Sequence, residues 1–146
     1  MLPIILNLTQ LLLAALSGVL IGTRSQQGRW GIHFLIAIGA AMAMMVNNGI
    51  PGFIPGGVVW IDGAQVALAI SIVCAALIIS ARAGEDGILE AATVWAAGGA
   101  GMAAGAGLFF ECGFIALVSY WILGWDGMSA PPMDWLKKLK RKEPDR

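Results

Sequence analysis

Long apolar stretches, separated by short polar or glycine-rich breaks, occupy most of the chain. A helix needs about 20 apolar residues to cross the hydrocarbon core of a bilayer, and roughly 17 is the lower limit. Three stretches approach or reach this length, and a fourth, residues 88–125, is long enough for two helices that turn near residues 105–113. The pattern therefore predicts five membrane-spanning helices, at about residues 5–21, 31–46, 64–81, 88–106 and 109–125.

The predicted fold class is all-α, with a multi-pass transmembrane helical bundle at residues 1–125 and a polybasic tail at residues 126–146. Hydrophobic residues make up 58% of the 146 residues and charged residues 12%, whereas a soluble domain carries about 25% charged residues. No Lys or Arg precedes Arg24, and more apolar sequence follows it. We therefore expect the N-terminal stretch to remain as a helix and not to be removed as an export signal.

The basic residues are unevenly placed. All nine Lys and Arg residues lie in three segments, 22–30, 82–87 and 126–146. The connection at residues 47–63 and the turn near residue 109 contain none. Five helices place the two termini on opposite sides, and the cytoplasmic connections of membrane proteins carry an excess of Lys and Arg. The N-terminus is therefore predicted outside and the tail in the cytoplasm.

Small residues recur at four-residue spacing on two of the predicted helices. Such a bare helix face lets two backbones approach closely in lipid, where there is little hydrophobic drive between helices. Each face can serve the internal packing of the bundle, or a contact with a second copy or another membrane protein. The residues concerned are Ala14, Gly18 and Gly22 on the first helix and Ala97, Gly101 and Gly105 on the fourth.

Ionisable residues inside a membrane are candidates for functional sites, and this chain has few. Glu90 is predicted to open the fourth helix, where the helix dipole favours a carboxylate, and Asp62 precedes the third helix. Glu111, near the outer turn, either faces water or binds a cation or proton inside the bundle. His33 is interpreted as an interfacial histidine or as part of a proton relay, and Arg24 ends the first helix.

The tail combines basic and apolar residues close to the last predicted helix. We expect it to hold the cytoplasmic end of the protein against the anionic inner leaflet, with Trp135 dipping into the interface. Docking of an acidic partner is the alternative. No folded soluble surface accompanies this run, so nucleic-acid binding is not expected. The basic residues are Lys137, Lys138, Lys140, Arg141 and Lys142.

The residue types needed for catalysis are sparse. There is a single histidine, no Ser/His/Asp set in polar surroundings and no phosphate-binding glycine loop before a soluble helix. The two cysteines, Cys74 and Cys112, lie in or beside apolar stretches and are interpreted as free buried thiols. The sequence therefore predicts no enzyme activity, no cofactor and no metal site.

Taken in order, five short motifs resemble those of the MgtC/SapB family of bacterial inner-membrane proteins, over about residues 8–123. The best is Ala-Ala-Thr-Val-Trp-Ala-Ala, at residues 91–97, which is similar to part of the family's T-A-A-T-L-W-A-A. The others lie at residues 18–22, 33–41, 64–66 and 105–109. The resemblance implies a multi-pass protein of the bacterial inner membrane, in a short form that lacks the soluble C-terminal domain of longer members.

The resemblance carries some positions onto this chain and also shows departures. The polar or aromatic positions carried over are His33, Gln65, Thr93 and Trp95. The positions that depart are Arg24, Ser25, Gly31 and Glu90, which stand where the family has Glu, Arg, Arg and Thr.

Two hypotheses on function follow. The first is a non-catalytic regulatory or accessory protein that contacts another membrane protein or a second copy, as the resemblance implies. The second is a transporter of a cation, such as magnesium or a proton, or of another small solute, built around Glu111 with His33 or Asp62 assisting. A Glu111 that faces the bundle interior would favour transport, whereas a Glu111 that faces outward would favour the first hypothesis.

Overall fold

The computed structural model describes residues 2–25, 30–48, 62–81 and 85–124. Five helices were predicted, and five are present in this part of the chain, without any strand. The all-α fold class is therefore confirmed. The helices are α1 (Leu2–Gly22), α2 (Trp30–Asn48), α3 (Gly63–Ser80), α4 (Glu85–Gly105) and α5 (Phe109–Leu123).

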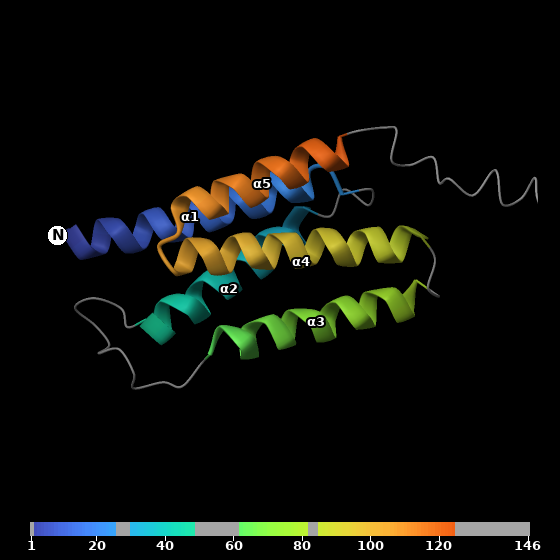
Figure 1. Ribbon diagram of the computed structural model, residues 1–146, viewed down its shortest axis with the longest axis horizontal. Coiled ribbons are helices and arrows are strands. Elements are labelled where there is room, and N and C mark those ends of the chain that lie inside the picture. Colours follow the sequence, from blue (N-terminus) through green and yellow to red (C-terminus); the bar gives the residue numbers. More distant parts are fainter. Residues whose placement is uncertain (1, 26–29, 49–61, 82–84, 125–146) are drawn as a thin grey trace, which may run out of the picture.

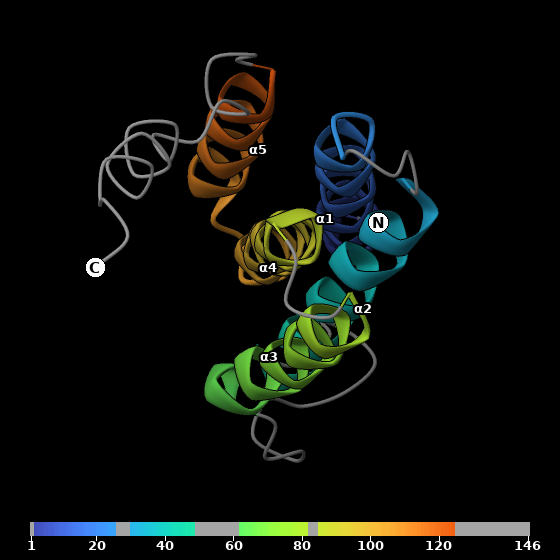
Figure 2. The ribbon, with the colours of Figure 1, turned by 90° about the vertical axis from the view of Figure 1, so that its right-hand side faces the viewer.

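Successive helices run in opposite directions, and α4 lies among the others (Figure 1). It contacts each of the other four helices. The end-on view shows α5, α1, α2 and α3 arranged around it, with one side left uncovered (Figure 2). This position accounts for the small side chains of α4, because a helix with four neighbours packs closely only where its surface is bare.

Small apolar side chains predominate inside the bundle, and many large ones lie on its surface. Most of the buried apolar residues are alanines, and no described leucine or phenylalanine is among them. Many of the large apolar side chains point outward: Leu35 is 68% exposed, Ile79 76% and Phe110 81%. A soluble bundle buries such residues, whereas a bundle in lipid packs through small residues and turns large ones outward.

Three of the helices are long and apolar enough to cross a membrane, over Ile4–Gly22, Trp30–Asn48 and Gly63–Ser80. The apolar α5 has 15 residues, so it is about 22 Å long. Because α4 contacts all four other helices, it presents less surface to lipid than they do, and its lower hydropathy does not exclude it from the membrane. The chain therefore has the lengths and surface of a membrane protein.

The small faces identified in the sequence point into the bundle. A Cβ added at Gly18 would lie 2.7 Å from the carbonyl oxygen of His33, so α1 and α2 touch at the backbone. A Cβ at Gly101 or Gly105 would collide with the carbonyl oxygens of Ala37 and Ala41, so α2 and α4 also touch at the backbone. The structure thus uses both faces for the internal packing of α1, α2 and α4, which contact one another.

Candidate functional site

Four buried polar residues gather at the end of the bundle where α1 ends and α2 and α4 begin. We refer to Ser25, His33, Glu90 and Thr93 as the polar cluster. Each is at most 6% exposed, and His33 is fully buried. Hydrogen bonds link these residues in two pairs, Ser25 with Glu90 and His33 with Thr93.

Glu90 does not open the fourth helix, so that prediction was wrong. The helix begins at Glu85, and five residues at 1.5 Å each place Glu90 about 7.5 Å further along its axis. The carboxylate of Glu90 accepts a hydrogen bond of 2.5 Å from the Ser25 hydroxyl. Among the described residues, no Lys or Arg forms an ion pair with Glu90. Glu90 is therefore a carboxylate inside the bundle, with one hydroxyl donor from the end of α1.

The second pair fixes the position of a hydrogen on His33. The Thr93 hydroxyl donates to the backbone carbonyl of Glu90 at 2.8 Å, and it lies 2.8 Å from His33 Nε2. A hydroxyl has one hydrogen to donate. Since Thr93 gives that hydrogen to Glu90, it accepts from His33, and Nε2 must carry a hydrogen. The imidazole thus ties α2 to α4 next to the buried carboxylate.

Close helix packing brings these short side chains together. A Cβ added at Gly22 would lie 2.6 Å from the Cα of Trp30 and 3.1 Å from the Cβ of His33. The glycine lets the start of α2 approach the end of α1, while Gly101 allows α4 to approach α2. The helices therefore lie close enough for the short side chains of Ser25 and Thr93 to bond to residues of a neighbouring helix, whereas larger residues at the glycine positions would hold the helices apart.

Arg24 lies outside the polar cluster. It is exposed, and its Nη2 donates a hydrogen bond of 2.9 Å to the hydroxyl of Tyr120 on α5. The guanidinium carbon also lies 4.4 Å from the centre of the Tyr120 ring, within the range of a cation–π contact. The pair joins the end of α1 to the last turns of α5. The contribution of Tyr120 was not predicted.

Glu111 and Asp62 lie at the opposite end of the bundle from the polar cluster, because α3 and α5 begin where α2 and α4 end (Figure 1). Glu111 is exposed, in the first turn of α5. Asp62 is also exposed and occupies the N-cap position of α3, where its side chain makes no capping hydrogen bond. The structure therefore separates Glu111 from His33, one of the two assisting residues of the transport hypothesis, and leaves Asp62 at the same end of the bundle as Glu111.

The other predicted positions are dispersed. Trp95 donates a hydrogen bond of 3.2 Å from its indole nitrogen to Ser71 on α3. Both cysteines are free and buried, and Cys74 bonds to the backbone oxygen of Ala91 at 3.2 Å. Within the described ranges, no group of three or more His, Cys, Asp or Glu residues is placed to hold a metal ion. The loop at residues 49–61 and the predicted tail contacts lie outside the described residues: Trp135, Lys137, Lys138, Lys140, Arg141 and Lys142.

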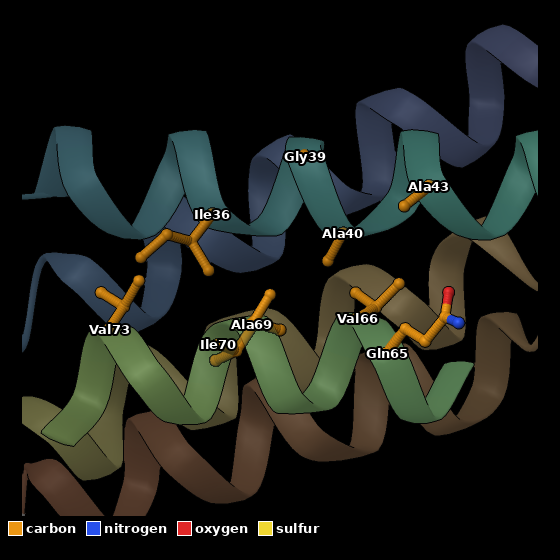
Figure 3. Close-up of a pocket in the computed structure, with 9 residues that line it drawn as sticks. All are labelled: Ile36, Gly39, Ala40, Ala43, Gln65, Val66, Ala69, Ile70 and Val73. Atoms are coloured by element: carbon orange, nitrogen blue, oxygen red, sulfur yellow. The ribbon is translucent and has the colours of Figure 1, made fainter. Parts of the chain in front are cut away.

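A lateral groove of about 380 Å³ separates α2 from α3 (Figure 3). Its walls are almost entirely apolar, and the amide of Gln65 is the main polar group along it. Gly39 leaves the α2 wall bare, since a Cβ added there would meet nothing within 4 Å. The lining residues are Ile36, Gly39, Ala40, Ala43, Gln65, Val66, Ala69, Ile70 and Val73.

Comparisons with protein-family models, curated proteins and solved structures gave no match to this chain. The resemblance to the MgtC/SapB family therefore rests on the sequence motifs. Two of the positions that depart from the family pattern, Ser25 and Glu90, contact each other in the structure. The chain thus has its own polar contact at these positions.

Proposed function

We propose that this chain is a non-catalytic regulatory or accessory protein of the MgtC/SapB type in a bacterial inner membrane. Its five helices span the bilayer, with the N-terminus outside and the C-terminus in the cytoplasm. It acts through lateral contacts with another membrane protein. The outward-facing large apolar side chains and the three span-length helices support the membrane part of this proposal.

The groove between α2 and α3 is the observation that carries the proposed mode of action. The walls of the groove are formed mainly by small or β-branched side chains, and Gly39 exposes the α2 backbone there. In lipid there is little hydrophobic drive for two helices to associate, so they associate where small residues allow their backbones to pack closely. Much of the remaining surface of the bundle carries large lipid-compatible side chains such as Leu35 and Leu117. The groove therefore offers a partner helix its best fit.

Site-specific photo-crosslinking in native membranes tests this proposal. A photoreactive residue at Ala69, in the groove, should yield one crosslinked membrane protein in stoichiometric amount. The same residue at Leu117, which is 65% exposed on α5, serves as the matched control and should yield none. Identical crosslinks from both positions, or recovery of the chain alone from both, would count against a specific lateral partner.

Transport of a cation or proton is the second candidate, and Glu90 favours it. Buried ionisable groups in membrane bundles often lie on ion pathways, and Glu90 is only 5% exposed, whereas Glu111 is exposed. The transport hypothesis therefore moves from Glu111 to Glu90. In liposomes, flux above background that is lost in Glu90→Gln and kept in Glu111→Gln would support it. An absence of flux for protons, magnesium and other cations would eliminate it.

A further inference from the structure

We propose that Arg24 and Tyr120 form a binding site for the phosphate group of an anionic phospholipid. This inference rests on the membrane insertion proposed above. Arg24 is the only Lys or Arg among the described residues, and it lies two residues beyond the end of α1. In the proposed orientation, its side chain is at the cytoplasmic surface, where anionic lipids are found.

The charge of Arg24 has no carboxylate partner among the residues that the structure describes. No described carboxylate forms an ion pair with it. The nearby carboxylate of Glu90 instead accepts a hydrogen bond from Ser25, the residue that follows Arg24. The one hydrogen bond from the Arg24 side chain goes to the neutral Tyr120 hydroxyl. An exposed guanidinium without a carboxylate partner is electrostatically complementary to a phosphate.

Tyr120 holds the guanidinium in one orientation. The hydroxyl accepts from Nη2 at 2.9 Å, and the ring centre is 4.4 Å from the guanidinium carbon. An arginine side chain on a surface normally loses rotamer freedom when it binds a ligand. Here part of that freedom is already lost, so phosphate binding is favoured by preorganisation.

The pair also supplies the correct set of donors. A guanidinium carries five N–H donors in a planar fork that fits two phosphate oxygens. The described residues leave those on Nε and Nη1 unused, and the Tyr120 hydroxyl keeps its own hydrogen to donate. Gly124 lies beside the guanidinium without covering it with a side chain; an added Cβ there would contact the guanidinium carbon at 3.5 Å. The site is therefore open to a headgroup.

Exposed aromatic residues at the same end of the bundle place this site at headgroup depth. Trp30 begins α2 and is 54% exposed, and Trp121 follows Tyr120 and is 66% exposed. Tryptophans concentrate where the hydrocarbon meets the headgroups. The guanidinium thus lies at the level of lipid phosphates, and an anionic lipid can meet it without leaving the bilayer.

The test measures lipid retention by the purified full chain with native mass spectrometry. Phosphatidylglycerol is compared with phosphatidylcholine of the same acyl chains. The unmodified chain should retain one phosphatidylglycerol in preference, and Arg24→Gln should weaken that binding about tenfold, as expected for loss of a charge-assisted contact. Tyr120→Phe keeps the ring and should cause a smaller loss. An unchanged preference in Arg24→Gln would overturn the site.

Two further comparisons keep the result interpretable. If Arg24→Gln does not fold, Arg24→Lys is used instead, because it retains the charge without the planar fork. Weakened retention of phosphatidylglycerol by this variant supports the site, and full retention overturns it. Neutralising the basic residues of the tail should lower the number of bound anionic lipids. It should not change the difference in phosphatidylglycerol retention between the unmodified chain and Arg24→Gln. Displacement of the lipid by inorganic phosphate would overturn the lipid assignment. Retention of both lipids without preference refutes this site but leaves membrane insertion standing.

Discussion

A single methyl group should separate α2 from α4 when it is added at Gly101, and the same methyl should be harmless at Gly99. Both glycines lie in α4, two residues apart. A Cβ at Gly101 would lie 2.8 Å from the Cα of Ala37 and closer still to its carbonyl oxygen. A Cβ at Gly99 would meet nothing within 4 Å. The pair of variants therefore tests the observed packing with one chemical change.

The magnitude follows from the distance. Carbon atoms are in favourable contact at about 3.5–4.0 Å, so Gly101→Ala requires α2 and α4 to separate by roughly 0.7 Å at this point. A gap of that size removes about a quarter to a half of each contact's dispersion energy. Replacing glycine by alanine in a helix gains up to about 1 kcal/mol at either position, so that term cancels in the comparison. We expect Gly101→Ala to be less stable than Gly99→Ala by about 1–3 kcal/mol.

The assay is reversible unfolding in mild detergent with increasing denaturing detergent, followed by circular dichroism. Gly105→Ala should behave like Gly101→Ala, because its Cβ would lie 2.7 Å from the Cα of Ala41. Gly39→Ala, on the open face of α2, should behave like Gly99→Ala. Equal stabilities for the Gly99 and Gly101 variants would show that α2 and α4 do not touch at the backbone.

The polar cluster and Glu111 give three further predictions. Thr93→Val removes the acceptor of His33 and should lower the free energy of unfolding by about 1–3 kcal/mol. Thr93→Ser keeps the hydroxyl and should lose much less; equal losses in the two variants would exclude a role for the hydroxyl. Ser25→Ala should be less damaging than Glu90→Ala, because it removes one donor without emptying the space of a long side chain, and thermal unfolding in detergent ranks the two variants. Glu111→Gln should leave the unfolding midpoint unchanged, and a clear shift would show that this carboxylate has a partner in the folded bundle.

The number of helices was predictable because apolar stretch length is a local property that the bilayer imposes. The bare faces of the first and fourth helices were also visible as a four-residue spacing of small residues. Whether those faces pack inside the bundle or against a partner was not decidable from spacing, since both uses require the same residues. It depends on which helix lies opposite, and Ala37 and Ala41 on α2 occupy that place.

The functional contacts were harder to predict because they join distant parts of the chain. Ser25 and Glu90 are 65 residues apart, and Arg24 and Tyr120 are 96 apart. Glu90 was misplaced for a local reason: the apolar stretch starts at Ile88, whereas the helix itself begins three residues earlier in polar sequence. A carboxylate near the edge of a hydrophobic stretch is easily mistaken for a cap when it lies in the second turn.

The membrane orientation of the bundle is tested most directly at the two ends of α3. Asp62 and Ala81 flank this 18-residue helix and are both exposed, and an α-helix of this length measures about 27 Å. In a background where Cys74 and Cys112 are replaced by alanine, a single cysteine is introduced at either position. A membrane-impermeant maleimide should label Asp62→Cys in intact cells and Ala81→Cys only after permeabilisation. Equal labelling of both positions in intact cells, or the reverse order, would contradict the proposed membrane-spanning bundle.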